Sequence, residues 1–303
     1  MRKIIDNGVK CLMTFTFERP RLVFLILLFL SACYSTSSLW VSTAGAQENL
    51  DPLVIAGAST LQPILEHLAP AYQAHTGQAL QITAGGSGAG IRQVMEEHAH
   101  VGMVSRALTT DEQAALTHVT IGLDSLVFIV NAQNPLPGIN REILQELYSG
   151  RISHWQSLCD WDQAVVLINK EIGRATLDLF EDYSGLRHPQ RGSSSHPRIS
   201  QQAIDIGSNL ESLTLVGGLP GAIGYVSMGS AYAMIDAGMP VRVLPLEDQM
   251  PNVQAVSSGI YPIQRQLNLV YKSPTPAITA LIQQALSSHG QQLVTEFGFI
   301  PVQ

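Results

Sequence analysis

The sequence is poor in charge, in cysteine and in long apolar runs. Charged residues make up 14% of its 303 residues, and the formal net charge is −7. No basic stripe is present that could neutralise a phosphate backbone, which argues against nucleic acid as a partner. Since 46% of the residues are apolar and no tract is of low complexity, the composition is typical of a globular protein with a sizeable core.

The longest apolar run near the N-terminus covers only residues 22–30 and follows several basic residues. This layout is typical of an export signal and is short for a bilayer span. The run leads into L-S-A-C, which ends at Cys33 and looks like the lipobox of bacterial lipoproteins. Cleavage after the A-x-A pattern at Ala46 is the alternative, but it lies farther from the run. We therefore expect a lipoprotein signal over 1–32, a lipid anchor on Cys33 and a flexible tether over 33–50.

Cysteine and histidine form no recognisable metal or disulfide pattern. Cys11 would leave with the signal and Cys33 would carry lipid, so Cys159 has no partner for an intrachain disulfide and is expected to be a small buried hydrophobe. His98 and His100 are two residues apart, but no third ligand accompanies them. We expect no metal and no cofactor.

From residue 51 onward, short apolar runs alternate with helix-periodic segments, which predicts an α/β fold. Strands are expected at 53–57, 79–83, 100–105, 121–131, 164–169, 221–227 and 261–272. Helices are expected from a cap at Ser59 and Thr60 to Gly77, after Gly90, and over 141–148, 175–183, 199–216 and 275–295. A polar loop fills 184–198. The repetition of strand and helix suggests two similar lobes with a ligand cleft between them.

Three segments share the order strand, small-residue turn, helix: GAST at 57–60, GGSGAG at 85–90 and EIGRAT at 171–176. A helix N-terminus offers free N–H donors, so each turn is a possible half-site for an oxyanion. Without residues 1–32, which hold five Lys/Arg and two Asp/Glu, the net charge becomes −10. Local groups, not the overall field, must therefore hold any anion.

GGSGAG allows three interpretations: a tight turn, an anion cradle made of main-chain amides, or a turn that presents Ser87 as a nucleophile. The last requires G-x-S-x-G, and here the final glycine is replaced by alanine. Asp124 with His154, His188 or His196 would complete a triad in chain order. With nine histidines in the chain, such a match arises easily.

Taken together, five blocks resemble the PstS-like phosphate-binding proteins of ABC-type phosphate importers, in order and in spacing. The blocks are GASTLQPILEHLAPAYQAHTG, ITAGGSGAGIRQVMEEHAHVGMVSRALTTDE, LDSLVFIVNAQNPLPGINREILQELYSGRISHW, PGAIGYVS and SSGIYPIQRQLNLVYK. The resemblance implies a type II periplasmic-binding-protein fold, in which each lobe is a mixed sheet flanked by helices and crossover strands join the lobes. Lobe 1 would comprise 51–125 plus 230–303, and lobe 2 would comprise 126–229.

The resemblance also implies the ligand-binding residues, at four places in the chain. They are Ser59, Thr60, Leu61, Ser87, Gly88, Ala89, Ser105, Arg106, Lys170, Gly173, Arg174, Ala175 and Thr176. The last group departs from the family's R-x-x-G-S-G-T, because Lys170 replaces the arginine and Arg174 replaces a hydroxyl. Arg174 either supplies the missing planar fork or pairs with Glu171. An acidic proton acceptor that some members carry is replaced here by Ser105 or Arg106, and Asp124 is a spare candidate for it.

The function implied by the resemblance is that of a monomeric extracytoplasmic protein, held on a bacterial membrane through Cys33. It would capture inorganic phosphate and deliver it to the permease of an ABC importer, without enzymatic chemistry. Two alternatives remain: the same fold serving another oxyanion or acting as a phosphate sensor, and a serine hydrolase that uses Ser87.

Overall fold

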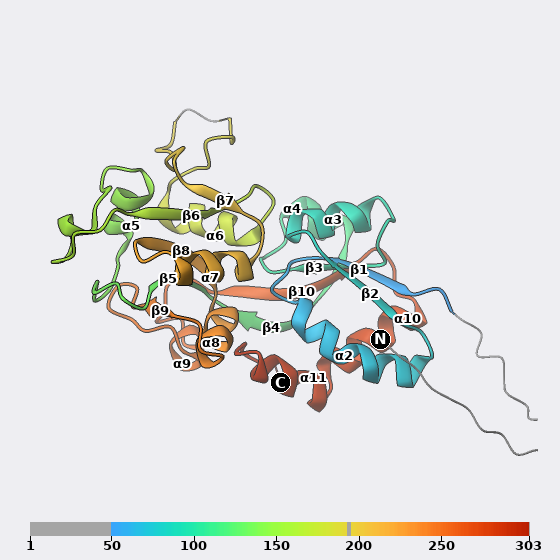
Figure 1. Ribbon diagram of the computed structural model, residues 1–303. Coiled ribbons are helices and arrows are strands. Elements are labelled where there is room, and N and C mark those ends of the chain that lie inside the picture. The colour runs from blue at the N-terminus through green and yellow to red at the C-terminus, as the bar shows by residue number, and fades with distance from the viewer. Residues whose placement is uncertain (1–49, 193–194, 303) are drawn as a thin grey trace, which may run out of the picture. The chain divides into compact units, whose positions relative to one another are not determined.

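The computed structural model describes residues 50–192 and 195–302, which build two five-stranded mixed sheets (Figure 1). The signal, Cys33 and the tether lie outside the described residues. The first sheet has the order β2-β1-β3-β10-β4, and the second has the order β7-β6-β8-β5-β9. The predicted α/β fold with two mixed sheets flanked by helices is confirmed.

The first sheet begins with the predicted β-α-β-α-β unit. Its elements are β1 (Leu53–Gly57), α2 (Gln62–Thr76), β2 (Leu80–Ala84), α3 (Ser87–Met95) and β3 (Val101–Val104). The three strands are parallel, with β1 in the middle, so their carboxyl ends and the turns that follow lie on the same edge of the sheet. Helix α2 covers one face of this sheet and α3 the other, and each encloses its own apolar cluster.

The second sheet repeats this order of directions. Strands β6 (Val166–Lys170), β7 (Ile204–Ile206) and β8 (Ala222–Ser227) are parallel, and β5 (Leu126–Asn131) runs antiparallel to β8. The first sheet has the equivalent antiparallel strand in β10 (Arg265–Tyr271), which pairs with β3. Each sheet thus has three parallel strands and then two that alternate in direction, as expected for two similar lobes.

The sequence predicted one strand over the apolar run 121–131, but the structure has two strands there. β4 (Thr117–Asp124) closes the first sheet and β5 starts the second, with the buried Ser125 between them. The Ser125 hydroxyl donates to the carbonyl of Ile263, just before β10. The two passages of the chain between the sheets therefore lie side by side. Apolar residues on both sides of Asp124 and Ser125 hid the break, although β4 itself is only partly buried.

The remaining elements lie mainly beside the second sheet. They are α4 (Thr110–Ala115), α5 (Arg141–Tyr148), a short 3₁₀ turn η1 (Trp155–Ser157), α6 (Ala175–Ser184), α7 (Asn209–Gly218), α8 (Met228–Asp236), β9 (Val241–Leu244), α9 (Val253–Ser257), α10 (Pro276–Leu286) and α11 (Ser288–Glu296). The helix expected over 199–216 is wrong in its first half, where the short, partly exposed β7 stands. Strand β9 pairs with β5, so the second sheet takes a strand from the part of the chain that the resemblance placed in lobe 1.

Cys159 is half-buried beside Trp155 and has no disulfide partner in the described residues. The part of the chain that the structure describes contains no helix with the length and hydropathy of a membrane span.

Candidate functional site

Three hydroxyls from three different turns meet at the carboxyl edge of the first sheet. Thr60 precedes α2, Ser87 starts α3 and Ser105 follows β3, and all three are buried. Ser87 Oγ accepts a hydrogen bond from the Ser105 amide at 3.0 Å and lies 3.5 Å from Ser105 Oγ. Three predicted site residues that are far apart in the sequence are therefore neighbours in the structure.

The sequence predicted that Thr60 helps to cap a helix, but in the structure it does not. Helix α2 begins after Leu61, which occupies the N-cap position without any side-chain cap, and a proline in the first turn removes one N–H that would need a partner. The Thr60 hydroxyl is therefore free to bond elsewhere. It accepts from Arg265 Nη2 and from Asn209 Nδ2, both at 3.3 Å.

At the centre of the cluster lies a completely buried ion pair between Arg265, at the start of β10, and Asp124, at the end of β4. Arg265 donates through Nε and Nη2 to the same carboxylate oxygen, Asp124 Oδ2, at 2.8 and 2.6 Å. The other carboxylate oxygen receives only a long contact, 3.5 Å, from the Gly229 amide. Burying a charge is costly unless it is paired and hydrogen bonded, so Asp124 is what allows Arg265 to be there.

The cluster has more donors than acceptors. Arg265 carries five N–H groups and no acceptor, and Asp124 takes only those on one edge. The other contacts go to hydroxyl oxygens and are long: 3.3 Å to Thr60 and 3.4 Å to Ser105. Because these hydroxyls act as acceptors, their own protons remain available as donors. Buried donors in excess are a site for an anion.

Asn209 brings the second sheet into this cluster. It is the first residue of α7 and is buried, and its side-chain amide donates to Thr60 at 3.3 Å and to Ser230 of α8 at 3.2 Å. Elements attached to both sheets thus contribute to the cluster.

The glycines of GGSGAG let this segment approach two other backbone segments closely. Gly86 has φ 89°, and a Cβ there would lie 2.8 Å from the carbonyl oxygen of Gly173. A Cβ on Gly90 would lie 2.8 Å from the Ala56 carbonyl oxygen, so this glycine lets α3 pack directly on β1. The Gly88 amide donates to the Gly173 carbonyl at 3.2 Å. Two of the predicted turns are therefore in direct contact.

Lys170, at the end of β6, is buried, and its ammonium donates to the Ser208 carbonyl at 2.6 Å. Burial lowers the pKa of Lys170 to about 7, because the charged form loses its hydration. The carboxylate of Glu211 opposes this shift, whereas the positive charges of Arg174 and Arg265 add to it. An anion in their midst would relieve this repulsion.

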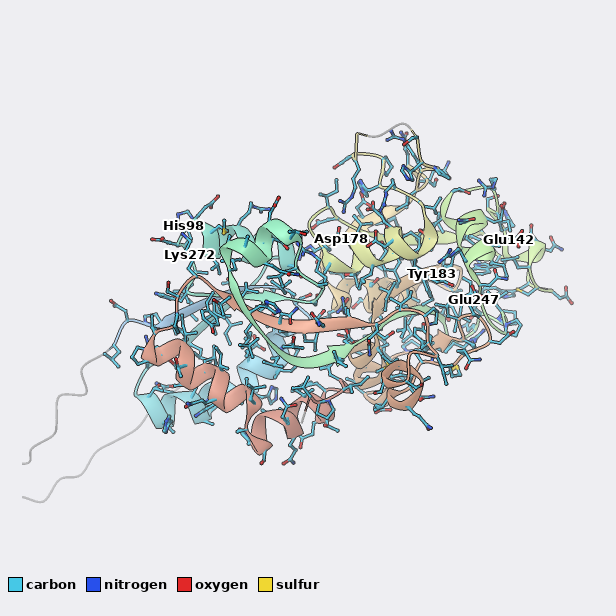
Figure 2. The ribbon with its side chains drawn as sticks, turned by 180° about the vertical axis from the view of Figure 1, so that it is seen from behind. His98, Glu142, Asp178, Tyr183, Glu247 and Lys272 are labelled. Carbon is cyan, nitrogen blue, oxygen red and sulfur yellow. The ribbon has the colours of Figure 1, made fainter. Side chains whose placement is uncertain are left out.

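Two arginines that the resemblance implied as ligands are paired with carboxylates. Arg106 donates through both Nη atoms to Glu112, at 2.7 and 2.8 Å, and its Nε lies 3.5 Å from Asp178 of α6. Figure 2 labels Asp178 at the end of its helix that approaches the first sheet. Arg174 pairs with Glu171 at 2.9 Å, the second of the two alternatives left open by the sequence.

For the other implied residues, no side-chain hydrogen bond to the cluster is found within residues 50–192 and 195–302. The Leu61 amide donates to the Ala58 carbonyl, and Ser59 lines a groove beside the cluster. Ala175 and Thr176 are buried in the first turn of α6, and Ala89 lies in the first turn of α3.

The histidines of the alternative triad lie elsewhere. His188 bonds to Asp205 at 2.9 Å, His196 lies in the polar loop, and His154 pairs with Ala164 in an isolated bridge. Asp124 is held by Arg265. Within residues 50–192 and 195–302, the hydrogen bonds of Ser87 Oγ involve Ser105 and no imidazole.

Sequence reasoning missed Arg265 and Asn209, although a signal existed for the first. Arg265 has the same parity as Leu267, Leu269 and Tyr271, which are buried along β10. A charge on the buried face of a strand requires a partner. Asn209 carried no such signal, because an asparagine beside a Ser208 cap is ordinary at a helix start.

Two similar mixed sheets that share a buried, donor-rich cluster define a two-lobed solute-binding protein. The model of the PBP superfamily domain matches residues 42–289, which is most of the chain. The chain belongs to this superfamily, and the predicted type II periplasmic-binding-protein fold is confirmed.

Relatives and solved structures point to one branch of that superfamily. The phosphate-binding protein PstS of Borreliella burgdorferi is 26% identical over 260 residues, which cover 84% of this chain and 92% of that protein. PstS of Bacillus subtilis is 25% identical over 86% of this chain and 84% of its own. A putative phosphate ABC transporter substrate-binding protein from Clostridium perfringens, solved with bound phosphate, has a TM-score of 0.74 and 26% identity, and covers 84% of this chain and 100% of its own. The resemblance predicted from the sequence is confirmed.

The buried pair gives a test of how the cluster is held. Replacing Arg265 with methionine leaves the Asp124 carboxylate buried without its cation, which we expect to lower the free energy of unfolding by about 3–5 kcal/mol. The double variant Asp124→Leu/Arg265→Met removes both charges and should recover most of that loss. Chemical denaturation without phosphate measures both.

The matched control is Arg151→Met, which removes the arginine of an exposed pair with Glu146 and should change stability little. If Arg265→Met were as stable as the unmodified chain, the pair would not be what supports the cluster.

Proposed function

We propose that this chain is an extracytoplasmic solute-binding protein that captures inorganic phosphate for an ABC-type importer. The single observation that carries the proposal is the surplus of buried donors around Arg265. Phosphate offers four oxygens to such donors, and a planar guanidinium can hold two of them at once. The names of the relatives and the phosphate bound to the Clostridium perfringens protein support the same ligand.

In this proposal phosphate binds at Arg265, Thr60, Ser87 and Ser105, and Asn209 closes on it from α7. Binding stabilises the state in which the two sheets share the ligand, and that closed state is what the permease recognises. No covalent chemistry is involved.

The remaining assignments follow from the same proposal. Residues 1–32 are the signal, Cys33 carries the lipid and 33–50 tether a monomeric body to a bacterial membrane. We place the end of lobe 2 directly before β10, so that residues 126–264, which include β9, belong together. Another oxyanion in the same site is the second candidate, because Lys170 and Arg174 depart from the family's pattern.

Calorimetry on the purified chain tests the function. We expect phosphate to bind with one-to-one stoichiometry and to raise the Tm. Ser87→Ala removes a hydroxyl donor to a charged ligand and should weaken phosphate binding by about tenfold or more.

Ser273→Ala, at an exposed position beyond the other end of β10, is the matched control and should bind phosphate as the unmodified chain does. Absence of heat and of a Tm shift with phosphate would end the proposal. A stronger response to sulfate would transfer it to the second candidate.

Lys170 makes phosphate binding proton-linked. The free ammonium has a pKa of about 7, so at about pH 8.5 it is mostly neutral, and a bound dianion should raise its pKa and recharge it. We expect an uptake approaching one proton per phosphate, and an affinity that falls as the pH rises above 7. Calorimetry in two buffers with different ionisation enthalpies measures the uptake.

Two variants separate this linkage from other titrations. Lys170→Met has no proton to gain and Lys170→Arg is always charged, so both should lose the uptake. Uptake that persists unchanged in Lys170→Met would refute the role of this residue.

A further inference from the structure

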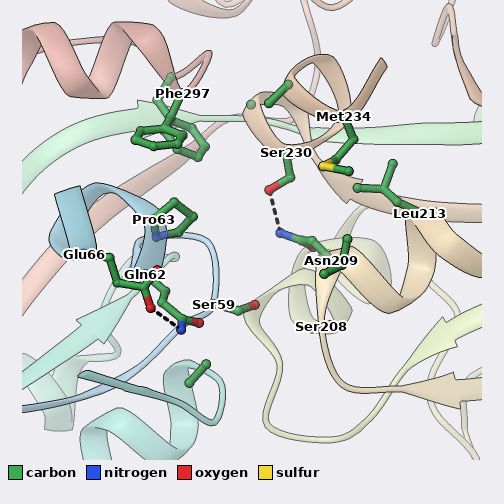
Figure 3. Close-up of a pocket in the computed structure, with 15 residues that line it drawn as sticks. Ser59, Gln62, Pro63, Glu66, Ser208, Asn209, Leu213, Ser230, Met234 and Phe297 are labelled. Atoms are coloured by element: carbon green, nitrogen blue, oxygen red, sulfur yellow. Dashed lines mark hydrogen bonds between the residues drawn. The ribbon is translucent and has the colours of Figure 1, made fainter. Parts of the chain in front are cut away.

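An apolar groove opens directly beside the anion cluster. It has a volume of 420 Å³, within the range of roughly 300–1,000 Å³ that is typical of small-molecule sites. Helix α2 forms one wall and helices α7 and α8 the other (Figure 3). Most of its lining is carbon, from Pro63, Leu213, Ala233, Met234 and Phe297. A four-oxygen anion cannot use such a surface.

Asn209 connects the groove with the cluster. It lines the groove, and its amide donates both to Ser230, another lining residue, and to Thr60 in the cluster. Figure 3 shows the Asn209 to Ser230 bond on the α7–α8 side of the groove. A molecule in the groove would therefore touch the same amide that belongs to the anion cluster.

The charges around the groove set the orientation in which an amphipathic ligand would bind. Glu66 stands on the α2 side, exposed and bonded to Gln62 at 2.7 Å, and its carboxylate disfavours an anion there. On the inner side, the Asn209 amide reaches Thr60, and Thr60 in turn accepts from Arg265. An amphipathic ligand is thus oriented with its anionic group toward Thr60 and Arg265 and its apolar part outward.

The groove stays open although the two sheets are already linked nearby. The Gly88 amide bonds to the Gly173 carbonyl, and Arg106 reaches Asp178. These contacts close the side of the cluster next to α3 and α6. On the side next to α2, α7 and α8 the link is the Asn209 amide, which bonds Thr60 and Ser230, and the groove begins directly beside that amide.

We propose that this chain also binds phosphomonoesters or phosphonates that carry an apolar substituent, with the phosphoryl group in the cluster and the substituent in the groove. The inference rests on the proposed phosphate site. Binding the substituent removes apolar surface from water on both the ligand and the groove, which adds affinity beyond that of the phosphoryl contacts.

Calorimetry first measures the binding of phosphate alone to the full chain. Phenylphosphonate is then added as the probe of the groove. We expect phenylphosphonate to displace bound phosphate. The variant Ala233→Phe places a ring in the groove from an exposed position of α8, so it should weaken phenylphosphonate about tenfold or more and leave phosphate within about twofold. Ala237→Phe, just beyond the end of α8 and outside the lining, is the matched control and should change neither.

The outcomes separate the two proposals. Failure of phosphate itself to bind would refute the proposed function, and this inference with it. Phosphate binding without displacement by phenylphosphonate would overturn this inference alone, and so would displacement that Ala233→Phe does not weaken.

Discussion

The ion pair between Arg265 and Asp124 is the contact on which the site depends. A guanidinium with no exposure to water is tolerable only when its charge is matched, and Asp124 matches it from one edge. The opposite edge is then left facing hydroxyls at long distances. Arg265 starts β10 and Asp124 ends β4, so the pair lies where the chain passes between its two sheets.

This arrangement explains how an acidic chain can hold an anion. Its net charge of −7 repels anions at a distance, so affinity must come from fixed, dehydrated donors at close range. In the proposed site, Arg265 and the hydroxyls would provide these donors, and Lys170 would provide a charge that appears when an anion arrives. A lysine with a pKa of about 7 can lose its proton in the empty site, so it destabilises that site less than a permanently charged second cation would.

Sequence reasoning recovered the parts of the fold that are local. The β-α-β-α-β unit from Leu53 to Val104 was predicted because each strand and helix has its own period and its own stop signal. The break at Ser125 was missed because apolar residues flank it on both sides, although Asp124 and Ser125 themselves are polar. Thr60, Ser87 and Ser105 were assigned to the candidate site by the resemblance, whereas Arg265 and Asn209 join it through hydrogen bonds to Thr60, more than 100 residues away along the chain. Such pairings have no local pattern.

A crystal structure of the chain grown with phosphate would show whether the anion binds at Arg265. We expect one anion whose oxygens lie about 3 Å from the free edge of the Arg265 guanidinium and from the hydroxyls of Thr60, Ser87 and Ser105. The Asp124 contact on the other edge should be unchanged. An anion bound away from these groups, or an Arg265 that still contacts only protein in a phosphate-saturated crystal, would contradict it.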